Sequence, residues 1–173
     1  MDSDLLLIAG RSAAGKTTVS AEVSAQLQQA GVGHCRMEGD WLDVAIPQAP
    51  PELFDRNFQA LWGNYRDFGC TRLIFTNWAS IKNASRLVTL MGGQPRVVGV
   101  LLTCTDETAR QRLGERERGA GLGWHLANLE ATPVGERDLD RLTPEWATRV
   151  RTDHRRVEDL AAEIVELTGW ARS

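Results

Sequence analysis

The sequence predicts an α/β fold in which a five-stranded parallel sheet lies between helices on both faces. Three observations support this prediction. Apolar runs typical of buried strands alternate along the chain with segments of helical periodicity, the pattern of repeated strand–helix–strand units. The first run leads directly into a glycine-rich loop that precedes a helix. The chain has 173 residues without an internal repeat or a linker, so we expect one domain over residues 1–173.

The first strand and the first helix show this pattern clearly. A continuous apolar run over residues 5–9 ends at Gly10, as expected for a parallel strand buried on both faces. The helix that follows, over residues 16–30, carries an apolar residue at every fourth position and ends at Gly31. We expect four further strands, over residues 34–38, 72–76, 96–103 and 148–152. We also expect four further helices, over residues 51–68, 81–91 and 106–118 and from Val157 to near Gly169.

The charge composition limits the classes of ligand. Arginine and lysine together number 20, of which 18 are arginine, and the formal net charge is −3. A general nucleic-acid binder would carry a strongly basic face, so we expect no nucleic-acid partner and only local phosphate binding. The run over residues 5–9 is too short for a membrane span or a signal sequence, and no later segment reaches the required length. We therefore expect a cytoplasmic protein without a membrane partner.

A complete phosphate-binding motif lies between the first strand and the first helix. Residues 10–17 fit the pattern GxxxxGK[ST]. In this pattern loop N–H groups and the helix N-terminus surround phosphate oxygens, Lys16 reaches the β- and γ-phosphates, and the Thr17 hydroxyl binds Mg²⁺. We therefore expect a nucleoside triphosphate, with Lys16 as a catalytic residue and Thr17 as a metal ligand. The expected nucleotide-binding residues are Gly10, Arg11, Ser12, Ala13, Ala14, Gly15, Lys16, Thr17 and Thr18.

Together with three later features, this motif makes the sequence resemble the P-loop kinases of small molecules and nucleotides. The later features are an aspartate that closes the second strand, an arginine-bearing segment after the fourth strand, and a final strand–loop–helix. The chain is similar to adenylylsulfate kinases, chloramphenicol phosphotransferases, shikimate kinases and adenylate kinases. The resemblance implies a three-layer P-loop fold with the strand order 2-3-1-4-5. It also implies ATP and Mg²⁺ as cofactors and a small-molecule acceptor.

The second expected strand ends in a candidate catalytic base. Because the strand ends beside the phosphate loop face the ligand crevice, Asp40 is expected to project toward the γ-phosphate. A carboxylate at that point can accept the proton of an attacking hydroxyl or hold that hydroxyl in line. The segment resembles the Asp-Gly-Asp turn of adenylylsulfate kinases. The alternative is a loop aspartate that caps the following turn, a role for which Asp43 is the better candidate.

Three tryptophans lie on segments that are expected to border the acceptor pocket. They are Trp41, Trp62 and Trp78, and an apolar or aromatic acceptor could stack against them. Packing in the core is the alternative for each of them. The end of the third strand departs from many P-loop enzymes, because Asn77 stands near the place where an acidic residue often serves Mg²⁺. Asn77 could act on the metal only through water, and it brings no charge.

An arginine pair marks an expected lid over approximately residues 110–135. Arg112 and Arg116 are four residues apart and therefore share one face of a helix. In adenylate and shikimate kinases such a pair closes over the nucleotide. The resemblance implies that Arg112 stacks on adenine and that Arg116 clamps the transferred phosphate as a catalytic residue. The alternative is an ordinary solvated helix face, since Glu115 and Glu117 alternate with the arginines.

These features predict an ATP-dependent phosphotransferase that moves the γ-phosphate to a hydroxyl of a small molecule, nucleoside or antibiotic-like acceptor. Three alternatives stay open at this point: a P-loop ATPase or nucleotide-binding switch protein, a nucleotide kinase with a phosphate acceptor, and a nucleotide-binding protein that has lost catalysis. The NKxD motif by which a GTPase reads its base is absent from the sequence. The identity of the acceptor, the choice between ATP and GTP, and the oligomeric state do not follow from the sequence.

Overall fold

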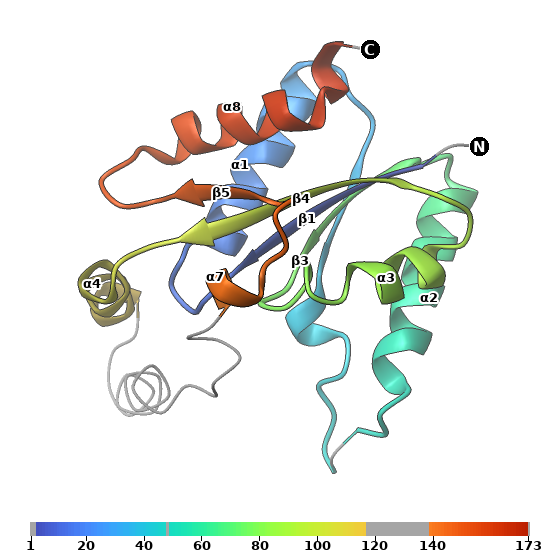
Figure 1. Cartoon of the computed structure of the whole chain (residues 1–173). Coiled ribbons are helices and arrows are strands. Elements are labelled where there is room, and N and C mark those ends of the chain that lie inside the picture. Colours follow the sequence, from blue (N-terminus) through green and yellow to red (C-terminus); the bar gives the residue numbers. More distant parts are fainter. Residues whose placement is uncertain (1–2, 48, 117–138, 173) are drawn as a thin grey trace.

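A computed structural model describes residues 3–47, 49–116 and 139–172 of the chain. Five strands form one parallel sheet in the order β2-β3-β1-β4-β5 (Figure 1), which confirms the predicted fold class and strand order. The strands are β1 (Asp4–Gly10), β2 (Cys35–Glu38), β3 (Arg72–Thr76), β4 (Arg96–Thr103) and β5 (Thr148–Arg151). The helices are α1 (Lys16–Gln29), α2 (Leu53–Asp67), α3 (Ala84–Met91), α4 (Asp106–Arg116), α7 (Leu139–Leu142) and α8 (Val157–Thr168), with the 3-10 turns η1 (Gly39–Trp41) and η2 (Trp170–Arg172).

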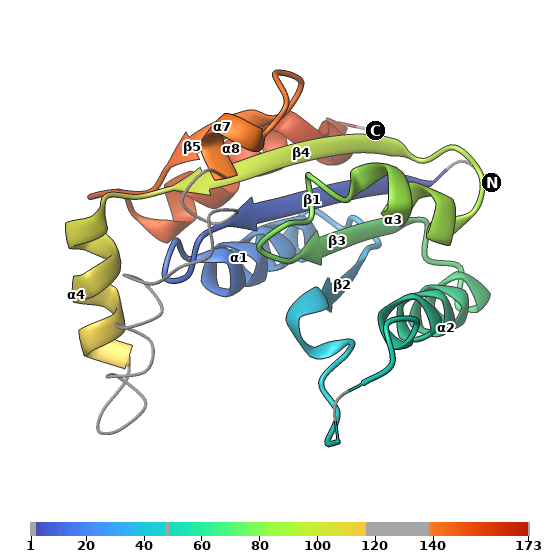
Figure 2. The same cartoon turned by 60° about the horizontal axis from the view of Figure 1, so that its bottom comes forward.

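β1 lies at the centre of the sheet, and helices cover both of its faces. It pairs with β3 on one side and with β4 on the other. Leu5 and Leu7 contact the core on the side of α2 and α3, whereas Leu6 and Ile8 contact the core on the side of α1 and α8. Figure 2 shows these two helical layers on opposite faces of the sheet. Burial on both faces explains why β1 is apolar at successive positions rather than at alternate ones.

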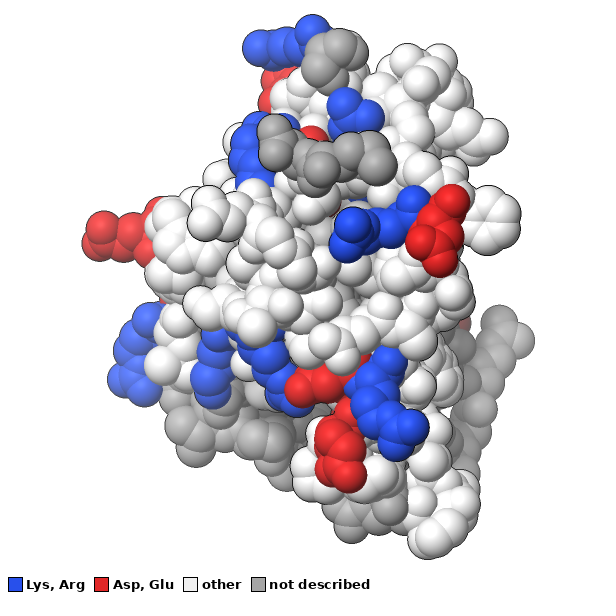
Figure 3. Space-filling model, turned by 90° about the vertical axis from the view of Figure 1, so that its right-hand side faces the viewer, with Lys and Arg blue, Asp and Glu red and all other residues white. Residues whose placement is uncertain are grey.

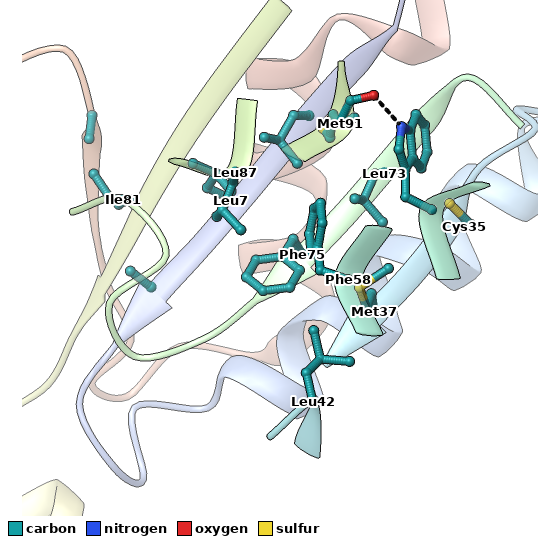
Figure 4. Close-up of a cluster of buried hydrophobic side chains, with 14 of the residues drawn as sticks. Leu7, Cys35, Met37, Leu42, Phe58, Leu73, Phe75, Ile81, Leu87 and Met91 are labelled. Carbon is teal, nitrogen blue, oxygen red and sulfur yellow. Dashed lines mark hydrogen bonds between the residues drawn. The ribbon is translucent and has the colours of Figure 1, made fainter. Parts of the chain in front are cut away.

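The core beneath α2 and α3 is rich in aromatic rings. The rings of Phe58 and Phe75 meet edge to face, with 5.4 Å between their centroids, and Phe54 lies 6.3 Å from Phe75 in the same arrangement. Trp62 is 2% exposed, and its indole Nε1 donates a 3.0 Å hydrogen bond to the Met91 carbonyl (Figure 4). This bond joins α2 to the end of α3, so both helices are fixed against β3.

The largest difference from the predicted element boundaries is at the start of α3. α3 begins at Ala84 rather than at residue 81, because the preceding residues form turns around Asn77. The Ser80 N–H donates to the Asn77 carbonyl, and the Ala79 N–H donates to the Asn77 side-chain oxygen. α4 begins at Asp106 as predicted and is described as far as Arg116. Most of the expected lid falls on residues 117–138, which lie outside the described residues.

The face that carries α2 and α3 has an interspersed distribution of charge. Figure 3 shows that basic and acidic side chains alternate over this face and that uncharged residues cover most of it. Among the helices of the described residues, none has the length and the apolar character that a membrane crossing requires.

Candidate functional site

The phosphate loop occupies residues 11–15, between the end of β1 and the start of α1. Its shape depends on Gly10, because a Cβ at this position would lie 2.8 Å from the Leu102 carbonyl oxygen of the neighbouring strand. Lys16 lies at the first position of α1, and its ammonium group donates to the carbonyls of Gly10 at 3.0 Å and Arg11 at 3.2 Å. These bonds hold the ammonium group over the loop, where the α1 N-terminus adds its positive dipole end.

Thr17 forms a contact that the sequence reasoning missed. Its hydroxyl donates a 3.1 Å hydrogen bond to the carboxylate of Glu38, the last residue of β2. The Arg36 guanidinium lies 3.5 Å from the other oxygen of the same carboxylate and also donates to the Ser20 hydroxyl at 3.1 Å. A carboxylate therefore stands beside the Thr17 hydroxyl, but it comes from β2 rather than from β3. The sequence signal for it was the Glu-Gly-Asp run of residues 38–40.

Asp40 lies in η1, directly after β2, and Asn77 orients its carboxylate. The Asn77 side-chain amide donates a 2.7 Å hydrogen bond to Asp40 Oδ1. Its oxygen accepts the Ala79 N–H at 3.0 Å, and this second bond assigns the oxygen and nitrogen of the amide. Gly39 lets η1 approach β3 closely, since a Cβ there would collide with the Phe75 ring. The sequence analysis considered Asn77 only as a partner of metal-bound water, whereas the structure shows it as the partner of Asp40.

Two pockets meet at Asp40. The first has a volume of about 890 Å³, and its lining includes Ser12, Ala13 and Gly15 of the phosphate loop together with Lys16, Thr17, Thr18, Glu38, Trp41 and Arg112. The second has a volume of about 400 Å³ and lies between η1, the start of α2, the end of β3 and the start of α3. Among the described residues, Asp40 alone lines both. Asp40 therefore lies at the border between the two pockets.

The structure separates the three tryptophans that were expected around the acceptor. Trp78 is 39% exposed and lines the second pocket. Trp41 is largely exposed and lines the phosphate-loop pocket instead. Trp62 lines neither pocket and is buried in the core with its indole bonded to Met91. The core-packing alternative therefore applies to Trp62, because its position on α2 turns it toward α3, and we remove it from the candidate site.

Arg112 connects three parts of the site. Its guanidinium donates to the Ala13 carbonyl of the phosphate loop at 3.2 Å, to the Thr152 hydroxyl at 3.0 Å and to the Thr152 carbonyl at 2.9 Å. The side chain thus bridges α4, the phosphate loop and the end of β5, and it also lines the phosphate-loop pocket. The Arg116 side chain, which was expected to clamp phosphate, lies outside the described residues. Arg11 of the phosphate loop forms an ion pair with Asp106 at the start of α4.

A buried carboxylate holds the start of α4 against the end of β5. The Asp153 side chain is 3% exposed and accepts hydrogen bonds from the Thr105 N–H at 3.0 Å, the Thr108 hydroxyl at 2.6 Å and the Arg151 guanidinium at 2.9 Å. Burial opposes ionisation of this group, but the hydrogen bonds from Thr108, Thr105 and Arg151 outweigh it and hold the pKa of Asp153 well below its usual range. Asp153 is therefore a structural anion that positions α4, and with it Arg112.

The comparisons with known proteins support the fold through solved structures rather than through sequence families. No protein-family model matches the sequence, and no curated protein is similar to it. Among the solved structures that are similar to it, three illustrate the match over nearly the whole chain. An APS kinase of Mycobacterium tuberculosis, solved with AMPPNP and APS, is 15% identical with a TM-score of 0.57 and covers 96% of this chain and 97% of that one.

The other two neighbours are also described as kinases. A sugar kinase of a Janibacter species is 20% identical with a TM-score of 0.57 and covers 98% of this chain and 96% of that one. A shikimate kinase of Acinetobacter baumannii, solved with shikimate, is 18% identical with a TM-score of 0.53 and covers 95% of this chain and 92% of that one. Sequence identities this low support a similarity of fold and nothing more specific. The strand order, the phosphate loop and these neighbours together show that the chain has the fold of the P-loop kinases of nucleotides and small molecules.

Proposed function

We propose that this protein transfers the γ-phosphate of ATP to a hydroxyl group of a small molecule. One observation carries the proposal: Asp40, the residue with the chemistry of a general base, is the described residue at which the phosphate-loop pocket and the second pocket meet. A phosphotransferase needs this arrangement, because donor phosphate and acceptor hydroxyl must approach each other in line. A simple ATPase has no use for a separate acceptor pocket beside the base.

Each polar group of the site has a distinct task in the proposed reaction. The oxygen of the acceptor hydroxyl forms the new bond to the γ-phosphorus, and Asp40 accepts the proton of that hydroxyl. At the same time the bond between the γ-phosphorus and the β–γ bridging oxygen breaks, and ADP leaves. Asn77 holds the Asp40 carboxylate toward both pockets. Lys16 and the loop N–H groups balance the negative charge of the phosphates. Arg112 adds cationic charge from the side of α4, and the role of Arg116 as a phosphate clamp stays an expectation from the sequence.

The residues beside Lys16 fit Mg²⁺. The Thr17 hydroxyl and the Glu38 carboxylate lie 3.1 Å apart, and both are the hard oxygen ligands that Mg²⁺ prefers. Asp40 supplies a second carboxylate in the same pocket. Bound Mg²⁺ would supply charge neutralisation for the phosphates, with Thr17 as its protein ligand and Glu38 ordering its water. The carboxylate at the end of β2 thus takes the place of the acidic residue that β3 lacks.

The structural neighbours favour a small acceptor. Their names describe kinases that act on APS, on sugars or on shikimate, and one of them was solved with a triphosphate analogue. The second pocket of about 400 Å³ matches a compound of that size. We propose ATP as the phosphate donor because the chain resembles these kinases. The assay described next should also compare ATP with GTP as the donor.

Acceptor-dependent ADP release tests the proposal. The panel consists of nucleosides, sugars, amino sugars, hydroxy acids and aromatic alcohols, each with ATP and Mg²⁺. For an acceptor that stimulates turnover, we expect Asp40→Asn to lower kcat by about 100-fold or more while the KM for ATP changes less than about threefold, because a general base contributes 10²–10⁴-fold to rate. Asp67→Asn, at the exposed end of α2, is the matched control and should leave both values unchanged.

Two outcomes would contradict the assignment. Equal losses of kcat and ATP affinity in Asp40→Asn would make Asp40 a nucleotide-binding residue rather than a base. ATP hydrolysis at a rate that no acceptor changes would favour the ATPase or switch protein that the sequence left open.

A further inference from the structure

The charged residues that line the second pocket carry more negative than positive charge. Among its described lining residues, Asp40 and Asp43 carry negative charge and Arg86 alone carries positive charge. Asp40 is committed to the reacting hydroxyl in the proposed function, on which this inference rests. Asp43 lies on the loop between η1 and α2, is exposed to solvent and lines the pocket.

The single cation of the pocket is already paired. Arg86 Nη2 lies 2.7 Å from Asp55 Oδ1, and the guanidinium stands over the Phe54 ring at 5.5 Å from its centroid. Asp55 and Phe54 both belong to α2, so Arg86 serves as a link between α3 and α2. An anion that bound here would have to compete with Asp55 for Arg86 and would also meet the like charges of Asp40 and Asp43.

The other polar groups of the pocket suit an uncharged ligand. Ser80 is 1% exposed, and its hydroxyl finds no hydrogen-bond partner among the described residues although Ser80 lines the pocket. A buried hydroxyl without a partner is costly, and a hydroxyl or amino group of a ligand would satisfy it. The rest of the wall combines the uncharged polar residues Asn77 and Asn83 with apolar residues, among them Trp78 and, from the core cluster of Figure 4, Phe75 and Leu87.

We infer that the acceptor is a hydroxyl compound without an anionic group, and that a positively charged amino group on it strengthens binding through Asp43. The negative charges of Asp40 and Asp43 disfavour the binding of anionic acceptors such as nucleoside monophosphates, sugar phosphates and carboxylic acids. This inference narrows the proposed function from small-molecule acceptors in general to neutral and amine-bearing ones, such as nucleosides, sugars and amino sugars.

Acceptors that differ only in charge test the inference. One series is glucose, glucosamine and glucuronic acid, and a second is a nucleoside and its 5′-monophosphate, each assayed by ADP release and by the change of Tm with a non-hydrolysable ATP analogue present. We expect kcat/KM to fall at least tenfold from the neutral to the anionic member of each pair and to rise severalfold from the neutral to the amine-bearing sugar.

Two variants connect the preference to its residues. Asp43→Asn should abolish the advantage of the amine, so that kcat/KM for glucosamine no longer exceeds kcat/KM for glucose, and Asp67→Asn should retain the wild-type preference. Asp55→Asn releases Arg86 from its partner and should raise the relative kcat/KM of the anionic members severalfold.

The failure of this inference differs from failure of the proposed function. If the anionic member of a pair is the better substrate, or if Asp43→Asn keeps the full preference for the amine, the inference is overturned while the kinase proposal stands. If no member of either series or of the wider panel stimulates ADP release or raises the Tm, the kinase proposal is overturned and the inference with it.

Discussion

Asp40 and Asn77 act as one unit at the scale of single residues. The 2.7 Å bond between them leaves one carboxylate oxygen of Asp40 committed to the amide and the other available to a ligand. The amide is fixed in turn by the Ala79 N–H, so the orientation of Asp40 depends on the turn that follows β3. Asn77 is thus a positioning residue, and a carboxylate in its place would repel Asp40 rather than hold it.

Removal of the Asn77 amide should therefore slow the proposed reaction without weakening nucleotide binding. For Asn77→Ala we expect kcat to fall about tenfold, because the base is no longer held in line, with the KM for ATP within twofold of the wild type. Steady-state kinetics with a stimulating acceptor provides the measurement. Asn64→Ala, at an exposed position of α2, serves as the control, and a kcat for Asn77→Ala equal to that of the control would refute the positioning role.

Lys16 gives a second test at the scale of the residue. The chain has two lysines, Lys16 in the phosphate loop and Lys82 on an exposed turn before α3. We expect ATP with Mg²⁺ to raise the Tm of the wild type and of Lys82→Ala equally, and to leave the Tm of Lys16→Ala nearly unchanged, because the compact ammonium charge beside the phosphates is lost. A full nucleotide-dependent shift in Lys16→Ala would contradict the assignment of the phosphate loop.

At the scale of elements, α4 is fastened to the rest of the site by buried polar contacts rather than by a large apolar surface. Arg112 bonds the phosphate loop and Thr152, and Asp153 bonds Thr105 and Thr108 at the start of α4. Between the phosphate loop and α4 lies only a small apolar cluster around Ala109 and Leu113. The position of α4 relative to the phosphate loop therefore depends on charged groups at its first and second turns.

The Asp153 contacts predict a pH-dependent contribution to stability. Asp153→Asn should lower the free energy of unfolding by about 1–3 kcal/mol at pH 7, because the hydrogen-bond donors around the carboxylate lose a charged acceptor. The pKa of Asp153 is lowered in the folded protein, so this contribution is present above the unfolded-state pKa of about 3.9 and is lost as the pH falls further. Denaturant unfolding from pH 7 to pH 3 measures it.

The difference between the unfolding free energies of the wild type and Asp153→Asn should shrink toward pH 3 without vanishing, because Asp153 is still ionised in the folded protein at that pH. Asp67→Asn should follow the wild type at every pH, since its exposed side chain has no comparable contacts. A difference between wild type and Asp153→Asn that stays constant down to pH 3 would show that the carboxylate is not stabilised by folding.

At the scale of the whole molecule, the apolar core and the candidate site occupy different parts of the sheet. The two core clusters fill the space between the sheet and its helices, and both pockets open at the carboxyl ends of the strands. Ligand sites at this end are general in open parallel sheets, because the strand ends leave a crevice where the connections diverge to opposite faces. Trp62 belongs to the core, whereas Trp78 lines the second pocket.

The two tryptophans should therefore respond differently to substitution. Trp62→Phe should lower the free energy of unfolding by about 1–3 kcal/mol through loss of its buried hydrogen bond and of packing volume, with the acceptor KM unchanged. Trp78→Ala should raise the acceptor KM severalfold and change the stability little, because its side chain is partly exposed at the pocket. Chemical denaturation and acceptor kinetics on both variants show whether each tryptophan contributes to core packing or to acceptor binding.

Much of the fold was predictable because it rests on local patterns. The apolar run of β1, the glycine at its end and the phosphate-loop motif identify a buried strand, a turn and a helix start within 20 residues. β4 was predicted over residues 96–103 and has those bounds, since both its faces are apolar. The strand order came from the resemblance to P-loop kinases, because periodicity alone does not say which strands are neighbours.

The sequence by itself determined the sheet-and-helix architecture, the phosphate loop and the choice of Asp40 as the candidate base. Only the tertiary structure decided which side chains meet there: Glu38 with Thr17, Asn77 with Asp40, and Arg86 with Asp55. The physical reason is that motif and periodicity depend on residues close in sequence, whereas these pairs join different elements. Their contacts follow from how β2, β3, α2 and α3 pack, and the charge of the second pocket follows from the same packing.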